Sequence, residues 1–279
     1  MLSPTDARPS FSNDVGQRYI DLLAMCLTRD GFPEHWRPPT PEGRARQVVN
    51  RCIQGVLRRA RLELVRPVRL DLGGIQAHPE AETMVGRANL GIIERCIRSV
   101  CRERIPGDLI ETGVWRGGAV VFMRAMLSVL GDRERVVWAA DSFQGLPEPD
   151  ADLYPADCGD TLFRNRNLAI SLEEVKQSFS RYGLLDQQVR FLKGWFKDTL
   201  PTAPIDHLAL LRMDGDMYES TMDALSHLYP KLSVGGYAIV DDFHLAGARQ
   251  ATLDYRQEYG IEDEIVRINS ASIYWRRSS

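Results

Sequence analysis

The sequence is poor in lysine and cysteine, and each shortage argues against one class of protein. Only four of its 279 residues are Lys, against 31 Arg, and the formal net charge is −3. We find no basic stripe of the kind that nucleic-acid-binding surfaces carry. The five Cys are scattered and form no C-x-x-C pair, which argues against a disulfide framework and favours reduced thiols in the cytoplasm. The five His show no metal-ligand spacing, so zinc is not expected.

Long apolar runs are also missing. Residues 1–16 lack the apolar segment of a secretory signal and are expected to form a flexible tail. No run approaches the length of roughly 20 residues that a membrane span needs. The dinucleotide fingerprint G-x-G-x-x-G is absent as well, because Trp115 stands where a second Gly would follow Gly113. This absence disfavours a nicotinamide-dependent oxidoreductase, which is one alternative for an α/β chain.

From about residue 86 onward, apolar runs of strand length alternate with helical patterns. Strands are expected at 108–114, 135–141, 188–194, 207–214 and 235–241, and helices at 82–100, 117–130, 171–183, 219–229 and 246–259. This rhythm predicts a parallel sheet with right-handed crossovers. At the end, 264–268 and 271–276 predict two strands of a hairpin. A doubly wound, mostly parallel α/β sheet with a C-terminal antiparallel hairpin is the outline of class I S-adenosylmethionine (SAM) methyltransferases.

Residues 17–85 are expected to add an N-terminal helical cap to this core, which spans 86–279. Residues 19–26 predict a helical or mixed segment, and the Pro-rich stretch 32–41 predicts a loop. A basic amphipathic helix is expected at 45–66, packed on the domain with its Arg side chains in water, rather than on a membrane or a partner. Residues 66–74 are expected to be extended. The long segment 146–170 predicts a lid over the acceptor.

Two acidic pairs close two of the expected strands: Asp214 with Asp216, and Asp241 with Asp242. In a parallel sheet the carboxyl ends of the strands lie at one edge, where ligands bind. Four converging carboxylates repel one another unless something positive lies between them, and a hard divalent cation suits their oxygens. Each Asp alone would be read as an N-cap of the next helix, but two separated pairs favour a metal.

The turn after the first strand predicts a SAM site. Gly113 and Gly117 would let a ligand approach the backbone closely. Glu111 would repel a pyrophosphate but suits the amino group of a methionine moiety. Asp141, which closes the second strand, can bind both ribose hydroxyls. Trp195 offers an aromatic wall for the adenine, with core packing as the alternative. The expected cofactor-binding set is completed by Thr112, Ser142, Gly194 and Asp214.

Five motifs in order resemble the macrocin and mycinamicin sugar O-methyltransferase family (TylF-type), whose members methylate sugar hydroxyls of antibiotics. The motifs are PGDLIETGVWRGG (106–118), DSFQGLP (141–147), KGWFKDTLP (193–201), LRMDGDMYEST (211–221) and GGYAIVDDFH (235–244), and YIDLLAMCLT (19–28) resembles the family's N-terminal segment. The resemblance implies SAM as donor, Mg²⁺ dependence and a homodimer or larger homo-oligomer. The acceptor it implies is a sugar hydroxyl of a glycosylated antibiotic precursor, such as the noviose 4-hydroxyl of an aminocoumarin.

The same resemblance assigns Asp214, Asp241 and Asp242 as the metal ligands. Asp216 is then expected to be the general base, because a carboxylate outside the coordination shell keeps its basicity. It would point to the same side as Asp214 if the chain stays extended. Asp214 in both roles, and His244 as base, are the alternatives. A metal-dependent catechol or phenol O-methyltransferase is the alternative function, since it would use the same core and metal.

Overall fold

The computed structural model describes residues 14–30, 32, 34–37, 43–62, 64–69 and 80–279. Its centre is a seven-stranded sheet in the order β5-β4-β3-β6-β7-β9-β8. The parallel strands are β3 (Asp108–Thr112), β4 (Val137–Asp141), β5 (Val189–Lys193), β6 (Leu208–Met213) and β7 (Leu232–Val240). A terminal hairpin of β8 (Val266–Arg267) and β9 (Ile273–Arg276) adds antiparallel to β7. The predicted sheet is therefore confirmed.

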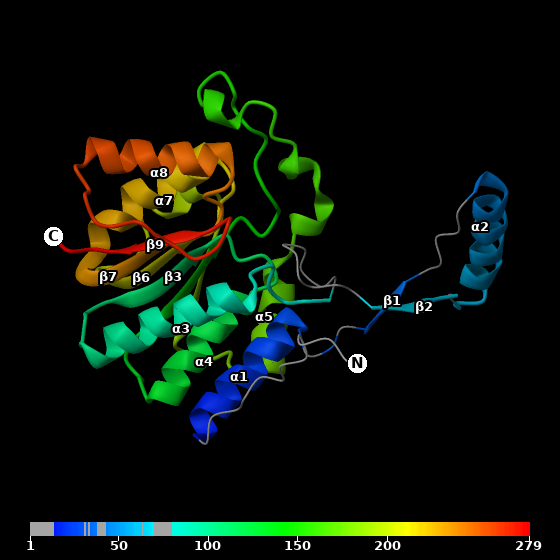
Figure 1. The fold of residues 1–279 in the computed structure, drawn as a ribbon, viewed down its shortest axis with the longest axis horizontal. Helices are drawn as coiled ribbons and strands as arrows, with labels where there is room; N and C mark the ends of the chain where they lie inside the picture. The colour runs from blue at the N-terminus through cyan, green and yellow to red at the C-terminus, as the bar shows by residue number, and fades with distance from the viewer. Residues whose placement is uncertain (1–13, 31, 33, 38–42, 63, 70–79) are drawn as a thin grey trace, which may run out of the picture.

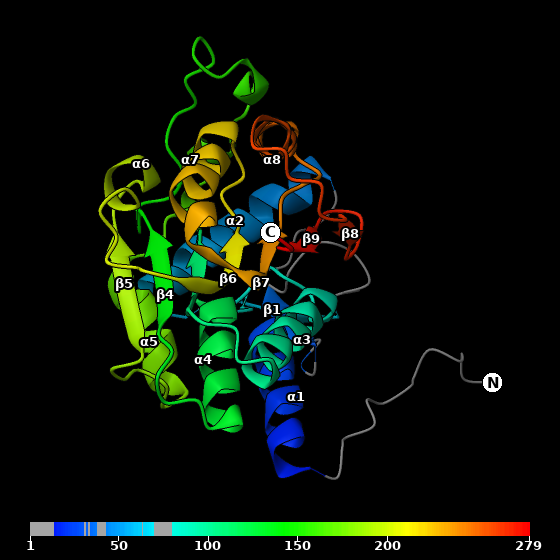
Figure 2. The ribbon, with the colours of Figure 1, turned by 90° about the vertical axis from the view of Figure 1, so that its left-hand side faces the viewer.

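Helices cover both faces of the sheet, as Figure 2 shows. One face carries α1 (Val15–Thr28), α3 (Arg87–Arg102), α4 (Gly118–Leu130) and α5 (Leu172–Arg181), and the other carries α6 (Phe196–Thr199), α7 (Tyr218–Leu228) and α8 (Ala246–Glu258). The buried apolar side chains form one core cluster under each set of helices. Leu109 and Ile110 of β3 belong to different clusters, because successive side chains of a strand point to opposite faces.

The central strand β6 shows why this sheet is buried on both faces. Its sequence, LALLRM, contains five apolar residues, and all six side chains are buried. Parallel strands covered on both faces typically read as continuous apolar runs. Arg212 is the one charged residue of this strand, and its side chain is nevertheless only 1% exposed. A charged group at that depth needs partners, and these lie in the site described below.

Most of the predicted elements lie within a few residues of their expected bounds. The largest shift in the body is that α3 begins at Arg87 instead of residue 82. The preceding stretch is irregular because the carbonyl of Glu82 accepts a hydrogen bond of 2.8 Å from the backbone N–H of Gly118, at the start of α4. The hairpin strands are shorter than expected, because Asn269 accepts hydrogen bonds from the backbone N–H groups of Ala271 and Ser272 and shapes the connection.

The N-terminal predictions need correction in two places. Residues 1–13 lie outside the described residues, but α1 begins at Val15, inside the expected tail 1–16. The side chain of Asp14 caps this helix by accepting a hydrogen bond from Gly16. Ile20 and Leu27 of α1 are buried in the first core cluster, so this helix is part of the body. The segment 17–85 is therefore not a uniform cap that is separate from the core.

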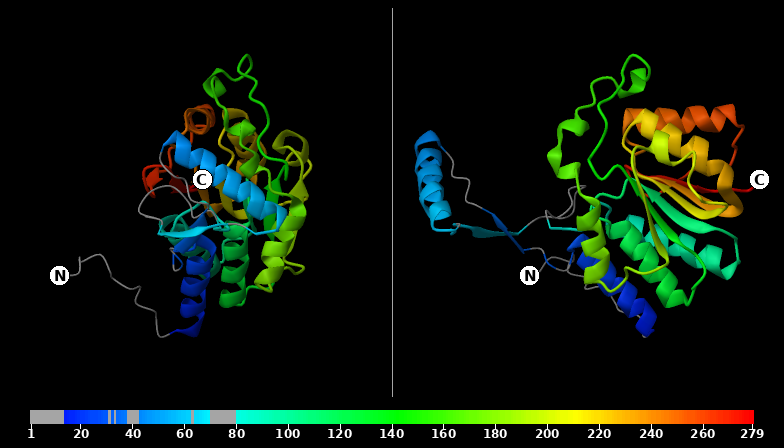
Figure 3. Two further views of the ribbon diagram at one scale, coloured as in Figure 1. Left: turned by 90° about the vertical axis from the view of Figure 1, so that its right-hand side faces the viewer. Right: turned by 180° about the vertical axis from the view of Figure 1, so that it is seen from behind.

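The second correction concerns residues 32–69. β1 (Glu34–Arg37) pairs antiparallel with β2 (Arg66–Arg69), so a strand lies inside the predicted loop 32–41. Only 66–69 of the extended segment 66–74 fall within the described residues. The basic helix is α2 (Arg44–Arg59), and it does not pack on the domain as expected. The strand pair carries it away from the body, as Figures 1 and 3 show.

The predicted lid segment, 146–170, forms a long excursion from the carboxyl edge of the sheet (Figure 1). It contains three single-turn 3₁₀ helices, Pro155–Asp157, Leu162–Arg164 and Arg166–Leu168. Its function as a lid stays a prediction. Among the helices of the described residues, none combines the length and the apolar character that crossing a membrane requires.

Candidate active site

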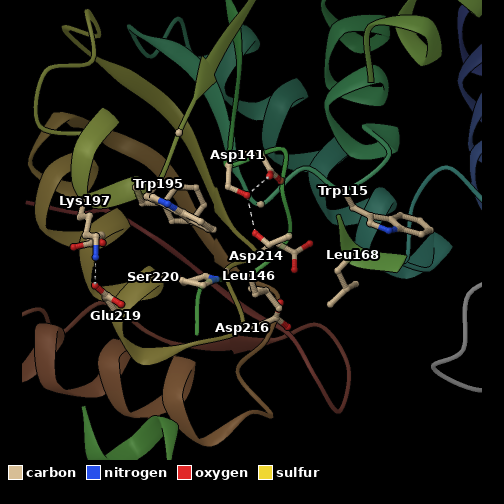
Figure 4. Close-up of a pocket in the computed structure, with 18 of the residues that line it drawn as sticks. Trp115, Asp141, Leu146, Leu168, Trp195, Lys197, Asp214, Asp216, Glu219 and Ser220 are labelled. Carbon is tan, nitrogen blue, oxygen red and sulfur yellow. Dashed lines mark hydrogen bonds and ion pairs between the residues drawn. The ribbon is translucent and has the colours of Figure 1, made fainter. Parts of the chain in front are cut away.

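A cavity of about 830 Å³, its open mouth included, lies at the carboxyl edge of the sheet. The chain runs from β3 outward to β4 and β5 and then crosses to β6 on the other side of β3. Strand order reverses at this point, and such a reversal opens a crevice where α/β proteins bind ligands. Figure 4 shows Trp115 and Trp195 on opposite sides of the cavity, with Asp141, Asp214 and Asp216 between them.

Gly113 lets β3 and β6 approach each other at the floor of the cavity. Its φ is +86°, and a Cβ atom at this position would lie 1.6 Å from the backbone oxygen of Asp214. The N–H of Asp214 in turn donates to the carbonyl of Thr112 at 2.8 Å. Glycine is therefore needed here for a positive φ and for a close backbone contact at once. The contact places the backbone of Asp214 directly against the predicted cofactor turn.

Asp141 connects the turns that follow β3 and β4. Its carboxylate accepts hydrogen bonds from the backbone N–H groups of Val114, at 2.7 Å, and Phe143, at 2.6 Å. Burial raises the pKa of Asp141, and these backbone donors oppose the rise. A carboxylate oxygen can accept a second hydrogen bond. The position at the cavity wall is therefore compatible with the predicted ribose contact, which stays a prediction.

The predicted metal ligands come together at the ends of β6 and β7. Asp214, Asp241 and Asp242 each offer an oxygen atom, and the three atoms lie within 4.8 Å of one another. Around an octahedral Mg²⁺ with bonds of roughly 2.1 Å, neighbouring oxygens lie about 3.0 Å apart and opposite ones about 4.2 Å, so the three oxygens would draw closer together around one ion. Burial, together with the adjacent Asp214 carboxylate, raises the pKa of Asp242 well above its ordinary range. The donor set fits a hard divalent cation.

Arg212 is a cation of the site that the sequence analysis missed. Its guanidinium group is ion-paired with Glu111, with Asp214 at 2.9 Å and with Asp241 at 3.1 Å. Arg212 therefore positions two of the three predicted metal ligands, Asp214 and Asp241. Asp216 and Asp242 add two carboxyl groups to the three that pair with Arg212, and burial and mutual repulsion raise the pKa of both, so further positive charge would stabilise their ionised forms. The available signal was a lone charged residue in the apolar run 208–213.

Asp241 is also fixed by two polar side chains that sequence reasoning did not identify. Asn89, from α3, donates to its Oδ1 at 2.6 Å, and Ser272 donates to the same oxygen at 3.1 Å. Asn89 is itself held by Asn269, which donates to its side-chain oxygen at 2.6 Å. These contacts hold Oδ1 of Asp241 and leave its second oxygen for a metal. No local motif marks Asn89, because its partners are distant in the sequence.

Asp216 lies beside the predicted metal ligands, but the chain does not reach it in the extended conformation that was expected. β6 ends at Met213, and Asp216 adopts a left-handed conformation with φ +60°. Its backbone N–H donates to the Oδ2 atom of Asp242 at 3.2 Å, which fixes the turn. The residue lines the cavity, and burial together with Asp214 raises its pKa to about 7. A carboxylate with these properties can accept a proton near neutral pH.

The other predicted site residues divide into two groups. Six of the expected cofactor-binding residues line the cavity: Gly113, Asp141, Ser142, Gly194, Trp195 and Asp214. Glu111, Thr112 and Gly117 lie behind its wall instead. Glu111 is 2% exposed and pairs with Arg212, so its nearest cation is a protein side chain rather than the predicted amino group. His244, the third option for the base, is exposed and does not line the cavity.

The lid segment is fastened to the body by Asp157, which the sequence analysis did not single out. Its carboxylate accepts hydrogen bonds from the N–H of Tyr218, at 2.7 Å, and of Glu219, at 3.4 Å. It therefore caps α7, whose own N-cap residue, Met217, has no side-chain acceptor. Near the far end of the segment, the indole N–H of Trp115 donates to the carbonyl of Asn167. Both contacts hold the segment beside the cavity.

Comparison with known proteins agrees with this geometry. Residues 16–277 match the family model of the macrocin O-methyltransferases (TylF). The chain is 52% identical over 202 residues to the mycinamicin III 3''-O-methyltransferase of Micromonospora griseorubida, a match that covers 71% of this chain and 80% of that protein. It is 54% identical over 200 residues to the demethyldecarbamoylnovobiocin O-methyltransferase of Streptomyces niveus, with 71% of this chain and 76% of that protein covered.

Solved structures give the same result. The O-methyltransferase NovP superposes with a TM-score of 0.77 and 43% sequence identity, covering 95% of this chain and all of that one. The calicheamicin methyltransferase CalS11 superposes with a TM-score of 0.55 over 99% of both chains, at 19% identity, and therefore supports the fold alone.

Proposed function

The chain belongs to the macrocin O-methyltransferase (TylF) family, and on that premise we propose that it methylates a sugar hydroxyl of an antibiotic precursor, with SAM as donor and Mg²⁺ as a required metal. The observation that carries this proposal is the position of Asp214. Its backbone contacts the predicted cofactor turn, its side chain belongs to the acidic triad, and it lines the cavity. A methyl donor and a metal-held acceptor would therefore meet at one residue.

The proposed roles follow from where the side chains lie. Asp214, Asp241 and Asp242 would hold the cation, while Arg212 and Asn89 keep two of these carboxylates in place. Trp195 and the turn at Gly194 would form the wall of the cofactor site, with Asp141 near the ribose. The lid segment contributes Leu146, Pro147 and Leu168 to the cavity, and these apolar side chains would exclude water from the acceptor.

A sugar hydroxyl is a poor nucleophile, because its pKa lies far above neutral. A bound divalent cation supplies positive charge that lowers this pKa and favours one orientation of the acceptor. Asp216 then accepts the hydroxyl proton, because its carboxylate lies at the cavity wall next to Asp242 and outside the triad. With SAM held beside Trp195 and Asp141, its sulfonium would supply the methyl group to the deprotonated hydroxyl oxygen, and the donor would be released as S-adenosylhomocysteine. No covalent intermediate with the protein is required.

Among sugar acceptors, we place the noviose 4-hydroxyl of an aminocoumarin first. The 43% identity to NovP over 95% of this chain, and the 54% identity to a novobiocin-pathway O-methyltransferase, support this order. A relative named for tetracenomycin, from Streptomyces olivaceus, is 52% identical over a similar length, so other deoxysugars belong in the same test.

An acceptor panel tests the proposal directly. Purified protein is incubated with SAM, Mg²⁺ and, in separate reactions, a desmethyl aminocoumarin glycoside, a desmethyl macrolide, a rhamnosylated aromatic polyketide and a catechol. We expect methylation of at least one glycoside, loss of that activity in EDTA, and a methyl ether on the sugar by NMR. Methylation of the catechol alone would contradict the sugar assignment and favour the alternative class of acceptor.

A further inference from the structure

The helix α2 exposes an apolar surface that the other described residues do not cover. The side chains of Val48, Val49, Ile53 and Val56 are between 44% and 66% exposed. Spacings of four and three residues place Val49, Ile53 and Val56 on one face of the helix, and Val48 borders this face. Figures 1 and 3 show α2 standing away from the body at the end of the β1–β2 pair. We call residues 34–69, as far as they are described, the arm.

The arm is built as a defined element rather than as a loose loop. β1 and β2 pair through four consecutive positions, from Glu34 opposite Arg69 to Arg37 opposite Arg66. The side chain of Gln54 is buried, and it both donates to the carbonyl of Leu64 at 2.7 Å and accepts from its N–H at 3.4 Å. These bonds fix the chain after the helix against α2. An ordered helix that presents an uncovered apolar face is typical of a protein interaction surface.

The charge of the arm differs from that of the remaining chain. Residues 44–62 contain six Arg and no acidic residue, so the rest of the chain carries a formal charge of −9. The strongest local counterpart is the segment 148–160 at the outer end of the lid, which we call the acidic loop. It contains five acidic residues and no basic one; Asp157 is buried as the cap of α7, whereas Glu148, Asp150 and Asp152 are exposed. The loop also exposes the apolar side chain of Leu153 by 65%. A basic surface with an apolar face thus has a complementary surface within the same sequence.

Within one copy of the chain these two surfaces lie apart. Figure 1 shows the acidic loop rising above the sheet while α2 projects sideways from the body. In a dimer with a two-fold axis, a contact between the arm of one copy and the acidic loop of the other would occur twice. We propose that the arm docks on the acidic loop of a second copy of this chain, so that a two-fold dimer contains two arm-to-loop contacts. The apolar face of α2 and Leu153 would be covered together in each contact.

A lipid surface is the other occupant that a basic amphipathic helix fits. Residues 44–62 contain no aromatic residue, whereas helices that lie in a membrane interface commonly carry Trp or Phe on the apolar face. Anionic lipid would also leave the acidic loop without a counterpart. The observations therefore favour a second copy, independently of the reaction that the enzyme catalyses.

Charge exchange between the two surfaces gives a direct test. The arm variant carries Arg46→Glu, Arg51→Glu, Arg58→Glu and Arg59→Glu, and the loop variant carries Glu148→Lys, Asp150→Lys and Asp152→Lys. In each variant alone, arm and loop have charges of the same sign. When the two variants are mixed, both contacts join opposite charges. A control variant, Arg133→Glu with Arg267→Glu, reverses exposed charges on the body.

Molar mass is measured by sedimentation equilibrium and by native mass spectrometry, with circular dichroism to verify folding. We expect the wild type and the control to be dimers, and each single variant to dissociate with a Kd raised by about 100-fold or more. The mixture should contain a one-to-one heterodimer. A monomeric wild type, a single variant that remains a dimer, or a monomer that binds anionic phosphatidylserine vesicles through the arm would each overturn the proposal.

Discussion

Replacing Gly113 by alanine should damage both the fold and the metal site, and its effect can be worked from the structure. The new Cβ would lie 1.6 Å from the backbone oxygen of Asp214, which is far inside contact distance. Holding an L-residue at this positive φ costs about 1–2 kcal/mol. Relief of the overlap would also break or lengthen the 2.8 Å hydrogen bond from Asp214 to Thr112, worth about 0.5–1.5 kcal/mol. We expect a total loss of about 3 kcal/mol, because the backbone of β6 must also move.

A matched glycine separates the two causes. Gly131 has φ +71° at the end of α4, but a Cβ atom there would meet nothing within 4 Å. Gly131→Ala therefore measures the cost of the positive φ alone, about 1 kcal/mol or slightly more. Free energies of unfolding are obtained from urea titrations of both variants and the wild type, in EDTA and in Mg²⁺.

The metal provides a second readout for the same variant. Movement of Asp214 would separate it from Asp241 and Asp242, so we expect Mg²⁺ affinity to fall by about 10- to 100-fold in Gly113→Ala and to stay unchanged in Gly131→Ala. Equal losses of stability in the two variants, with Mg²⁺ binding intact in both, would refute the argument that Gly113 is required by its contact with Asp214.

Three further perturbations test other parts of the account. Arg212→Met should lower the free energy of unfolding in EDTA by about 3–5 kcal/mol, because it leaves buried carboxylates unpaired. Arg124→Met is the control and should cost less, because the carboxylate of its partner Asp186 is 32% exposed. Equal losses in urea titrations of the two variants would count against a special role for Arg212. Asp157→Ala should cost about 1 kcal/mol by uncapping α7 and should speed hydrogen exchange in 148–160; unchanged exchange there would mean that Asp157 does not fasten the segment. Burial and Glu219 raise the pKa of Asp223 from 3.8 to about 6, so its ionisation in the folded state reduces stability as pH rises from about 4 to 6. Asp223→Asn should therefore raise the melting temperature at pH 7 and leave it nearly unchanged at pH 4; the same shift at both pH values would contradict this sign.

The sheet could be predicted because its signals are local. Apolar runs such as LALLRM end abruptly at acidic residues, and parallel strands bring those ends to one edge, so the meeting of Asp214 with Asp241 and Asp242 followed from the topology. The hairpin followed from the turn at Asn269.

The supporting contacts could not be predicted in the same way. Arg212 completes the acidic cluster through an ion pair with Glu111, about a hundred positions away in the sequence, and Asn89 reaches Asp241 across a still longer separation. Such pairs depend on the register between β3 and β6 and on the position of α3, which single-residue patterns do not specify. The reasoning from charge alone therefore expected a metal where a guanidinium supplies part of the positive charge.

The predicted position of α2, packed on the domain, was wrong for a related reason. An amphipathic pattern indicates that a helix has an apolar face, but not which surface covers it. The Arg side chains were expected on the water-facing side of a helix packed on the domain, although the strands β1 and β2 hold this helix away from the body. The turn at Asp216 was likewise read as extended, because a left-handed φ at a residue other than glycine leaves little trace in the sequence.

The most direct test of the central claim compares Asp216→Asn with Asp242→Asn and wild type. Mg²⁺ binding is measured by titration calorimetry, and methyl transfer from SAM to the preferred glycoside is followed in the same preparations. If Asp242 is a metal ligand and Asp216 the general base, Asp242→Asn loses Mg²⁺ and turnover together, whereas Asp216→Asn keeps Mg²⁺ and S-adenosylhomocysteine binding and loses turnover. Turnover that survives in Asp216→Asn would rule out Asp216 as the base, and wild-type turnover that is unaffected by EDTA would rule out a required metal.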